Sequence, residues 1–97
     1  MVNYRRNFVP GGTYFFTVNL AERSERLLIG HIELLRTTFR AVRRDHPFSI
    51  DAIVVLPDHL HAVWTLPQND SEYALRWRLI KTNFSRSLAL GEPGRAQ

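Results

Sequence analysis

Apolar and β-branched residues concentrate in three short segments, and this composition predicts three β-strands. The segments are residues 13–20, 48–56 and 59–66. In the third segment every second side chain points to the same face of the sheet, and this face is apolar: Leu60, Ala62, Trp64 and Leu66. Because only Pro57 and Asp58 separate the second segment from the third, these two strands must pair as an antiparallel hairpin.

Two longer segments repeat their apolar residues at the spacing of an α-helix. In residues 30–44 the apolar positions are Ile32, Leu35, Phe39 and Val42. In residues 71–90 they are Tyr73, Trp77, Ile80, Phe84 and Leu88. Pro47 ends the first helix, and Asn69 with Glu72 resembles a capping box ahead of the second.

The order strand, helix, strand, strand, helix predicts an α+β fold, a ferredoxin-like βαββα arrangement with an antiparallel sheet that lacks its final strand. Both helices should pack on one face of a sheet of only three strands. Since an unpaired sheet edge invites pairing with another strand, we expect a homodimer through this edge. We treat residues 1–97 as a single domain, with residues 1–12 as a flexible basic arm and residues 91–97 as a mobile tail.

A length of 97 residues allows one small domain. The sequence contains no cysteine, which excludes a disulfide framework and a cysteine-based zinc site. No apolar run approaches the roughly 18 residues of a membrane helix, and the N-terminus lacks the apolar stretch of a signal peptide. We therefore expect a cytoplasmic protein without a membrane partner.

The chain is basic, with a formal net charge of +4 and a pI of about 10.3. All 13 basic residues except Lys81 are arginines, whose planar guanidinium group suits bidentate contacts with phosphate. Charge alone leaves two interpretations open, a nucleic-acid partner or a merely basic surface.

The most informative polar residues are two histidines in the third predicted strand. Because His59 and His61 are two residues apart, their imidazoles point to the same face and can share one metal ion. Imidazole suits zinc, manganese, nickel or iron, whereas magnesium prefers oxygen ligands. The alternative is a pair of half-exposed histidines on a polar sheet face, which need no metal. The His-x-His spacing by itself does not decide between the two.

The surrounding sequence resembles a known family. PDHLHAVWTLP, followed by RWRLIKTNFSR, is similar to the signature region of the REP-associated tyrosine transposases, and NYRRNFVPGGTYFFTVNLAER is similar to the beginning of those proteins. The resemblance runs from residue 3 to about residue 88. This family is part of a wider group of single-strand endonucleases and transposases with a His-hydrophobic-His triplet, which here is His59-Leu60-His61.

The resemblance implies a ferredoxin-like sheet whose open face carries His59 and His61 as ligands of a divalent metal, Mg²⁺ or Mn²⁺. It also implies binding of single-stranded or hairpin DNA from repetitive palindromes, and metal-dependent strand cleavage and transfer through a phosphotyrosine. In the family the nucleophilic tyrosine lies on a helix beyond the region that matches residues 71–90. We therefore expect this chain to lack the catalytic helix, to contain no catalytic tyrosine and to be inactive alone.

Two other functions stay open beside the transposase. The first is a catalytically dead module that binds single-stranded nucleic acid. The second is an RNA-binding ferredoxin-like domain of unrelated descent, which predicts aromatic residues on the central strands. His59 and His61 occupy the comparable positions here, which disfavours the RNA-binding domain.

Four basic residues are predicted to contact DNA: Arg5, Arg6, Arg76 and Lys81. Arg5 and Arg6 lie in the N-terminal arm, and basic arms of this kind often contact phosphates or bases. The equal alternative is that this terminus is solvated and contacts no DNA. By helical angle, Arg76 and Lys81 flank the apolar stripe of the second predicted helix.

The sequence also indicates roles for four further residues. Asp58 either stabilises the hairpin turn, the favoured interpretation, or orients an imidazole. Phe15 on the open sheet face either stacks on a base or packs against a further helix. Tyr73 belongs to an apolar stripe and is predicted to lie in the core, so it is not a nucleophile. Tyr14 points to the same core face.

Overall fold

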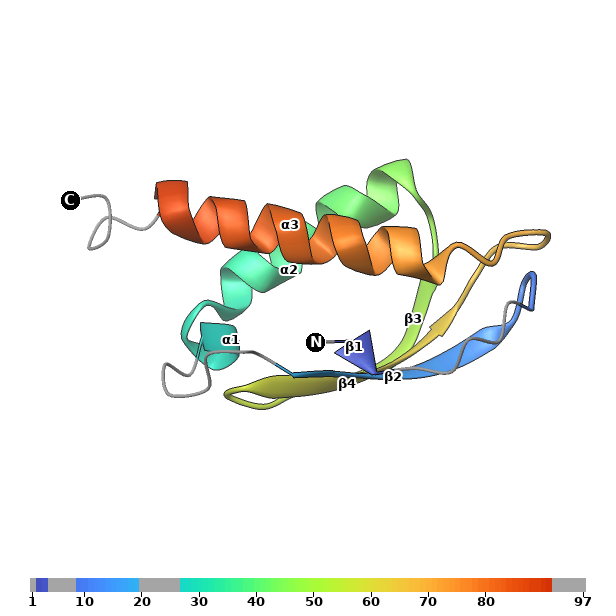
Figure 1. Ribbon diagram of the computed structural model, residues 1–97, viewed down its shortest axis with the longest axis horizontal. Coiled ribbons are helices and arrows are strands. Elements are labelled where there is room, and N and C mark those ends of the chain that lie inside the picture. Colours follow the sequence, from blue (N-terminus) through green and yellow to red (C-terminus); the bar gives the residue numbers. More distant parts are fainter. Residues whose placement is uncertain (1, 4–8, 20–26, 92–97) are drawn as a thin grey trace.

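The computed structural model describes residues 2–3, 9–19 and 27–91, and these form an antiparallel sheet with helices on one face (Figure 1). The elements in chain order are β1 (Val2–Asn3), β2 (Thr13–Asn19), α1 (Leu27–Gly30), α2 (Ile32–Asp45), β3 (Ser49–Val55), β4 (His59–Thr65) and α3 (Tyr73–Gly91). The predicted α+β fold is therefore confirmed, and its helices and sheet fit the ferredoxin-like arrangement.

The sheet has four strands in the order β1-β2-β4-β3, and each neighbouring pair is antiparallel. The prediction of only three strands is wrong, because β1 pairs with Thr17 and Val18 of β2. β1 lies in the segment that was expected to be irregular, and two residues are too few to show a periodic pattern. β3 lies at an outer edge of the sheet, with no described strand on its other side.

The helices match the apolar stripes, with different boundaries. Where one helix was predicted from residue 30, the chain forms the short α1 and then α2, which begins after His31. Ahead of α3, the backbone N–H of Glu72 donates to Oδ1 of Asp70 at 2.8 Å, while Asn69 has a φ of 69°. Asp70 therefore caps this turn, and the predicted role of Asn69 is wrong. None of the helices in the described ranges is long and apolar enough to cross a membrane.

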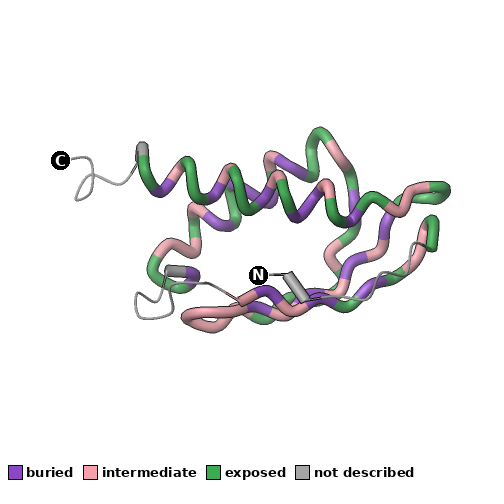
Figure 2. Tube along the Cα trace, viewed as in Figure 1, coloured by how far each residue is buried: buried purple, intermediate pink, exposed green. Residues whose placement is uncertain are grey.

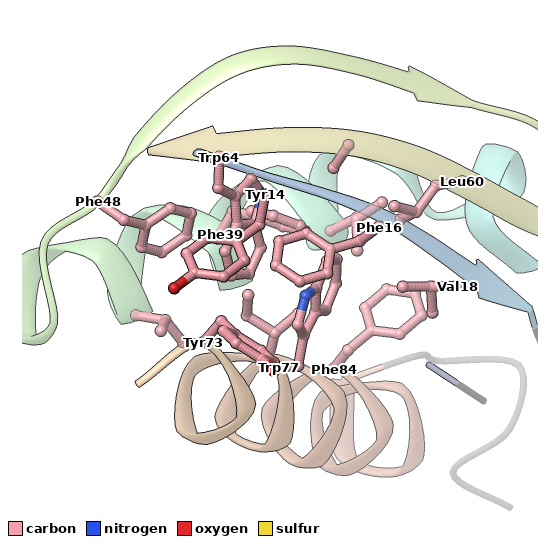
Figure 3. Packing of buried hydrophobic residues seen from close by; sticks show 14 of the residues in the cluster. Tyr14, Phe16, Val18, Phe39, Phe48, Leu60, Trp64, Tyr73, Trp77 and Phe84 are labelled. Carbon is pink, nitrogen blue, oxygen red and sulfur yellow. The ribbon is translucent and has the colours of Figure 1, made fainter. Parts of the chain in front are cut away.

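The buried positions of the strands and helices are marked in Figure 2. An aromatic core fills the space between the sheet and the two long helices (Figure 3). The indole rings of Trp64 on β4 and Trp77 on α3 stack with centroids 4.4 Å apart and planes 17° apart. The ring of Phe16 on β2 meets Trp77 edge-on at 5.4 Å. All three side chains are fully buried, and aromatic pairs in these geometries add stability beyond their buried area. The even-numbered residues of β2 and β4 thus face the helices.

Candidate functional site

The face of the sheet that the helices leave uncovered carries both histidines. Along β4 the burial alternates residue by residue: Leu60 and Ala62 are buried, whereas His59, His61 and Val63 are partly exposed. Figure 2 shows buried and partly exposed positions next to each other in the strands below the helices. The prediction that His59 and His61 point to the same, open face is confirmed, while their binding of a metal stays a prediction.

Hydrogen bonds hold both imidazoles by the same ring nitrogen. Nδ1 of His59 lies 2.8 Å from Oδ1 of Asp58, and Nδ1 of His61 lies 3.1 Å from Oγ1 of Thr17. The two rings are 5.2 Å apart between centroids, with their planes at 84°. Since Nδ1 of each ring is engaged within the protein, Nε2 is the nitrogen that each ring can offer to a ligand.

Asp58 orients the imidazole of His59. The sequence favours a role in the hairpin turn, with this orientation as the alternative. A carboxylate oxygen can only accept, so in the neutral imidazole this hydrogen bond requires the ring proton on Nδ1, and Nε2 is then the nitrogen that can coordinate a metal. A carboxylate in this position is the usual partner of a metal-ligating histidine. The corresponding partner of His61, Thr17, was missed, because only the β2–β4 register places it opposite His61.

The donor set on this face consists of the two imidazoles. Among residues 2–3, 9–19 and 27–91, no group of three or more His, Cys, Asp or Glu side chains gathers in a geometry that can hold a metal ion. Two nitrogen ligands with oriented rings fit a metal that takes its remaining ligands from water or from phosphate oxygens. They do not fit a closed structural zinc site, which has four protein ligands.

An exposed aromatic ring lies beside the histidines. The side chain of Phe15 on β2 is 61% exposed, and its ring is nearly parallel to that of His61, with centroids 6.0 Å apart and planes 14° apart. Val54 on β3, opposite His61 across the strand pair, is also exposed. Exposed apolar rings of this kind can stack on nucleic-acid bases.

Both tyrosines in the described part of the chain lie on the opposite side of the sheet. Tyr73 is fully buried against Tyr14 and Phe16, as predicted for a residue of the core (Figure 3). The hydroxyl of Tyr14 donates to the carbonyl of Val9 at 2.5 Å and accepts from its N–H at 2.7 Å. Neither phenol reaches the histidine face.

Arg76 is buried, so the prediction that it contacts DNA is wrong. Its guanidinium group donates to both carboxylate oxygens of Asp70, at 3.1 and 2.9 Å, and to the carbonyls of His46, Pro47 and Glu72. These five contacts use all five donors of an arginine side chain. The helical angle correctly placed Arg76 beside the apolar stripe. It could not show that residues 46–47 and 70–72 surround the guanidinium group, because only the tertiary fold brings them there.

The same contacts act on the carboxyl group of Asp70. The hydrogen bond from Arg76, followed by the one from the backbone of Glu72, lowers the pKa of Asp70 below its ordinary value of 3.8. Burial opposes this change but is outweighed. Arg76 and Asp70 therefore tie the start of α3 to the chain between α2 and β3.

The other basic residues that were predicted to bind DNA are differently placed. Lys81 is exposed on α3, in the helical layer rather than on the histidine face. Arg5 and Arg6 lie outside the described residues. The DNA contacts of these three residues stay predictions.

Solved structures with this fold point to a class of protein. The chain matches a solved structure entitled "Structure of the REP associates tyrosine transposase bound to a REP hairpin" with a TM-score of 0.85 and 46% identity, over 96% of this chain and 58% of that one. A structure from Deinococcus radiodurans, with a TM-score of 0.67 and 17% identity, covers 98% of this chain and 72% of its own, and shows the fold alone. The fold is thus that of a transposase domain.

Sequence comparison finds two curated relatives. The chain is 48% identical over 90 residues to the REP-associated tyrosine transposase of Escherichia coli (strain K12). These 90 residues are 93% of this chain and 54% of that protein. A relative from Haemophilus influenzae is 43% identical over 88 residues, or 91% of this chain and 50% of its own length. No family model matches the sequence. The chain is a close homologue of REP-associated tyrosine transposases, and it spans about half the length of the curated relatives it matches.

Proposed function

We propose that the open face formed by β2, β4 and β3 binds single-stranded or hairpin DNA together with a divalent metal ion, Mg²⁺ or Mn²⁺, as part of metal-dependent DNA strand cleavage and transfer. The observation that carries the proposal is the pair of imidazoles on this uncovered face, each held by its Nδ1. The solved relative bound to a REP hairpin supports hairpin DNA as the partner.

His59 and His61 would hold the metal through Nε2. When bound, the metal would polarise a phosphate and stabilise the negative charge that develops during cleavage. Asp58 and Thr17 hold the two rings by Nδ1, which restricts their rotation and leaves the Nε2 atoms for the metal. Phe15 stacks on a base beside His61 and holds the strand over the site. Lys81 and the arm residues Arg5 and Arg6 bind phosphates.

The described residues do not provide the nucleophile, because Tyr14 and Tyr73 face the core on the other side of the sheet. We expect these 97 residues to bind DNA and metal without forming a covalent phosphotyrosine by themselves. This observation also favours the second candidate function, a catalytically dead module that binds single-stranded nucleic acid.

The test is to incubate the chain with Mn²⁺ and a hairpin and look for a protein–DNA band that survives denaturant. A band that Tyr14→Phe or Tyr73→Phe removes would contradict the proposal.

The metal site is tested by titrating Mn²⁺ while recording the NMR signals of the four histidine rings. A paramagnetic ion broadens nearby nuclei, so the signals of His59 and His61 should disappear first. His31 and His46 lie outside the open face and are internal controls. In the single variants His59→Ala and His61→Ala, the remaining ring of the pair should broaden less than in the unaltered chain, because one of the two ligands is gone. Equal broadening of all four rings would remove the metal assignment.

DNA binding is tested with a fluorescent hairpin that carries a single-stranded 5′ extension. Affinity should fall steeply as salt rises, because bound phosphates release counterions. Phe15→Ala should weaken binding by about 1–3 kcal/mol through the lost stacking. Ile29→Ala, which removes an exposed apolar side chain from α1, is the matched control and should change little. Equal affinity of Phe15→Ala and the unaltered chain would show that bases do not stack there.

A further inference from the structure

A groove of about 420 Å³ lies between α2 and the outer strand β3, on the helix side of the sheet. It is separate from the histidine face, which is on the other side of the same strands. Its walls come from two elements, and its lining residues are Ile32, Leu35, Arg36, Phe39, Arg40, Arg43, Ile50, Ile53 and Val55.

The floor of the groove is apolar and is not fully covered. Leu35 and Phe39 are buried at its base, and Ile50 and Val55 are partly buried. Ile53 is 39% exposed, although β-sheet alternation places it on the same face as the core residues of β4. Together with the partly buried Ile50 and Val55, it forms a contiguous apolar surface on which a further apolar group can be buried.

Three arginines from α2 form one rim of the groove. Arg36, Arg40 and Arg43 recur at helical spacing, so they line one side of α2 over about 10 Å. All three are exposed. Arg36 contacts Glu33 at 3.2 Å in a solvent-exposed pair, which a stronger anionic partner can displace at little cost.

The outer edge of β3 offers backbone groups beside this groove. Within the described residues β3 pairs only with β4, so alternate N–H and C=O groups of β3 point away from the sheet. A register irregularity lies between Ile50 and Ala52, and pairing is regular from Ala52 to Val55. An exposed sheet edge of this kind can accept an extended peptide as an added strand.

We propose that this groove docks an extended, acidic–apolar peptide segment of a protein partner, which adds as a strand to the free edge of β3. An apolar side chain of the segment covers Ile53, and acidic side chains two positions to either side meet the arginines of α2. Those acidic positions are about 13 Å apart in an extended strand, comparable to the length of the arginine rim. This function is additional to the proposed DNA binding.

Charge favours such a segment over a second copy of the chain. Edge-to-edge pairing of two β3 strands would bring two sets of Arg36, Arg40 and Arg43 together, and β3 carries only Asp51 as an acidic residue. Like charges placed opposite each other oppose association. Nucleic acid would match the arginines but would leave the apolar floor and the strand edge unused.

The proposal is tested with a labelled seven-residue peptide that has glutamate at positions 2 and 6, valine at position 4 and threonine elsewhere. Fluorescence anisotropy should detect binding to the unaltered chain. The double variant Arg36→Glu/Arg40→Glu should bind it about tenfold or more weakly and should gain affinity for a peptide with lysine at positions 2 and 6. The matched control Arg78→Glu/Arg86→Glu, which reverses two exposed charges on α3, should behave like the unaltered chain.

Backbone pairing is tested with the same peptide methylated on the amide nitrogens that would face β3, which should abolish binding. Unchanged binding of the methylated peptide would overturn strand addition. A loss of hairpin DNA affinity in Arg36→Glu/Arg40→Glu, with no binding of either peptide to the unaltered chain, would make the groove a nucleic-acid surface. A dimer in analytical ultracentrifugation that Ile53→Asp dissociates would assign the edge to a second copy. If circular dichroism shows that the double variant is unfolded, Ile53→Asp replaces it in the peptide assay and should lose binding.

Discussion

The two faces of β4 consist of alternating residues of one short strand, yet they lie in different environments. Leu60, Ala62 and Trp64 are buried under α2 and α3, where ring stacking and apolar burial hold the helices to the sheet (Figure 3). His59 and His61, their immediate neighbours in sequence, lie on the uncovered face with one ring nitrogen each held by a hydrogen bond. Along β4, a buried apolar side chain and a hydrogen-bonded imidazole thus follow each other directly in the sequence.

This difference indicates that stability and the candidate chemistry can be altered independently. Substitutions that face the helices should unfold the domain, and those that face away should change ligand binding alone. The variants below test this separation, beginning with the largest expected effect on stability.

Trp77→Ala should destabilise the domain by about 3–5 kcal/mol, because it removes the ring that stacks on Trp64 and leaves a cavity in the core. Chemical denaturation followed by circular dichroism measures the change. Phe15→Ala is the matched control, since it removes an aromatic ring from the open face, and it should change the free energy of unfolding by less than about 0.5 kcal/mol. Equal losses in the two variants would refute the separation of the faces.

Arg76→Lys should cost about 2–3 kcal/mol, because lysine keeps the charge but cannot reach five acceptors in a plane. The free energy of unfolding measures this loss. Arg78→Lys, an exposed change on the same helix, should be within about 0.5 kcal/mol of the unaltered chain. If Arg76→Lys lowered DNA affinity without any loss of stability, the structural role given to Arg76 would be wrong.

Acid should remove the stabilisation that Asp70 provides. Its pKa is lowered in the folded state by Arg76, so the stabilisation is fully present above the unfolded-state pKa and is lost as pH falls through the lowered folded pKa. Unfolding curves between about pH 6 and pH 2 should show Asp70→Asn less stable than the unaltered chain at the upper end, with the gap narrowing towards the lower end. A gap that stays constant over this range would contradict the cause given for the pKa change.

Asp58→Asn and Thr17→Val should have the smallest effect on stability, within about 0.5 kcal/mol, because both residues serve the open face. Their effect should instead appear in the Mn²⁺ titration. Asp58→Asn should weaken broadening at His59 more than at His61, and Thr17→Val should do the reverse, because each residue holds one ring. Identical broadening patterns in the two variants would show that these hydrogen bonds do not orient the imidazoles.

The sequence by itself determined the longer strands and the two long helices together with their buried faces, because the alternation in β4 and the apolar stripes of α2 and α3 extend over many residues. It also identified His59 and His61 as neighbours on one face, because two residues along a strand return to the same side. It could not determine β1, whose two residues carry no periodic signal.

The tertiary structure alone decided how the polar residues are used. Thr17 is 44 residues from His61 in the chain, and only the strand register makes it the partner of that imidazole. Arg76 shares its helix with Lys81, but the turn at Asp70 folds over Arg76 and buries it while Lys81 stays in solvent. Periodicity reports which face of an element a residue occupies, whereas the contacts that satisfy its polar atoms come from distant segments that only the fold brings together.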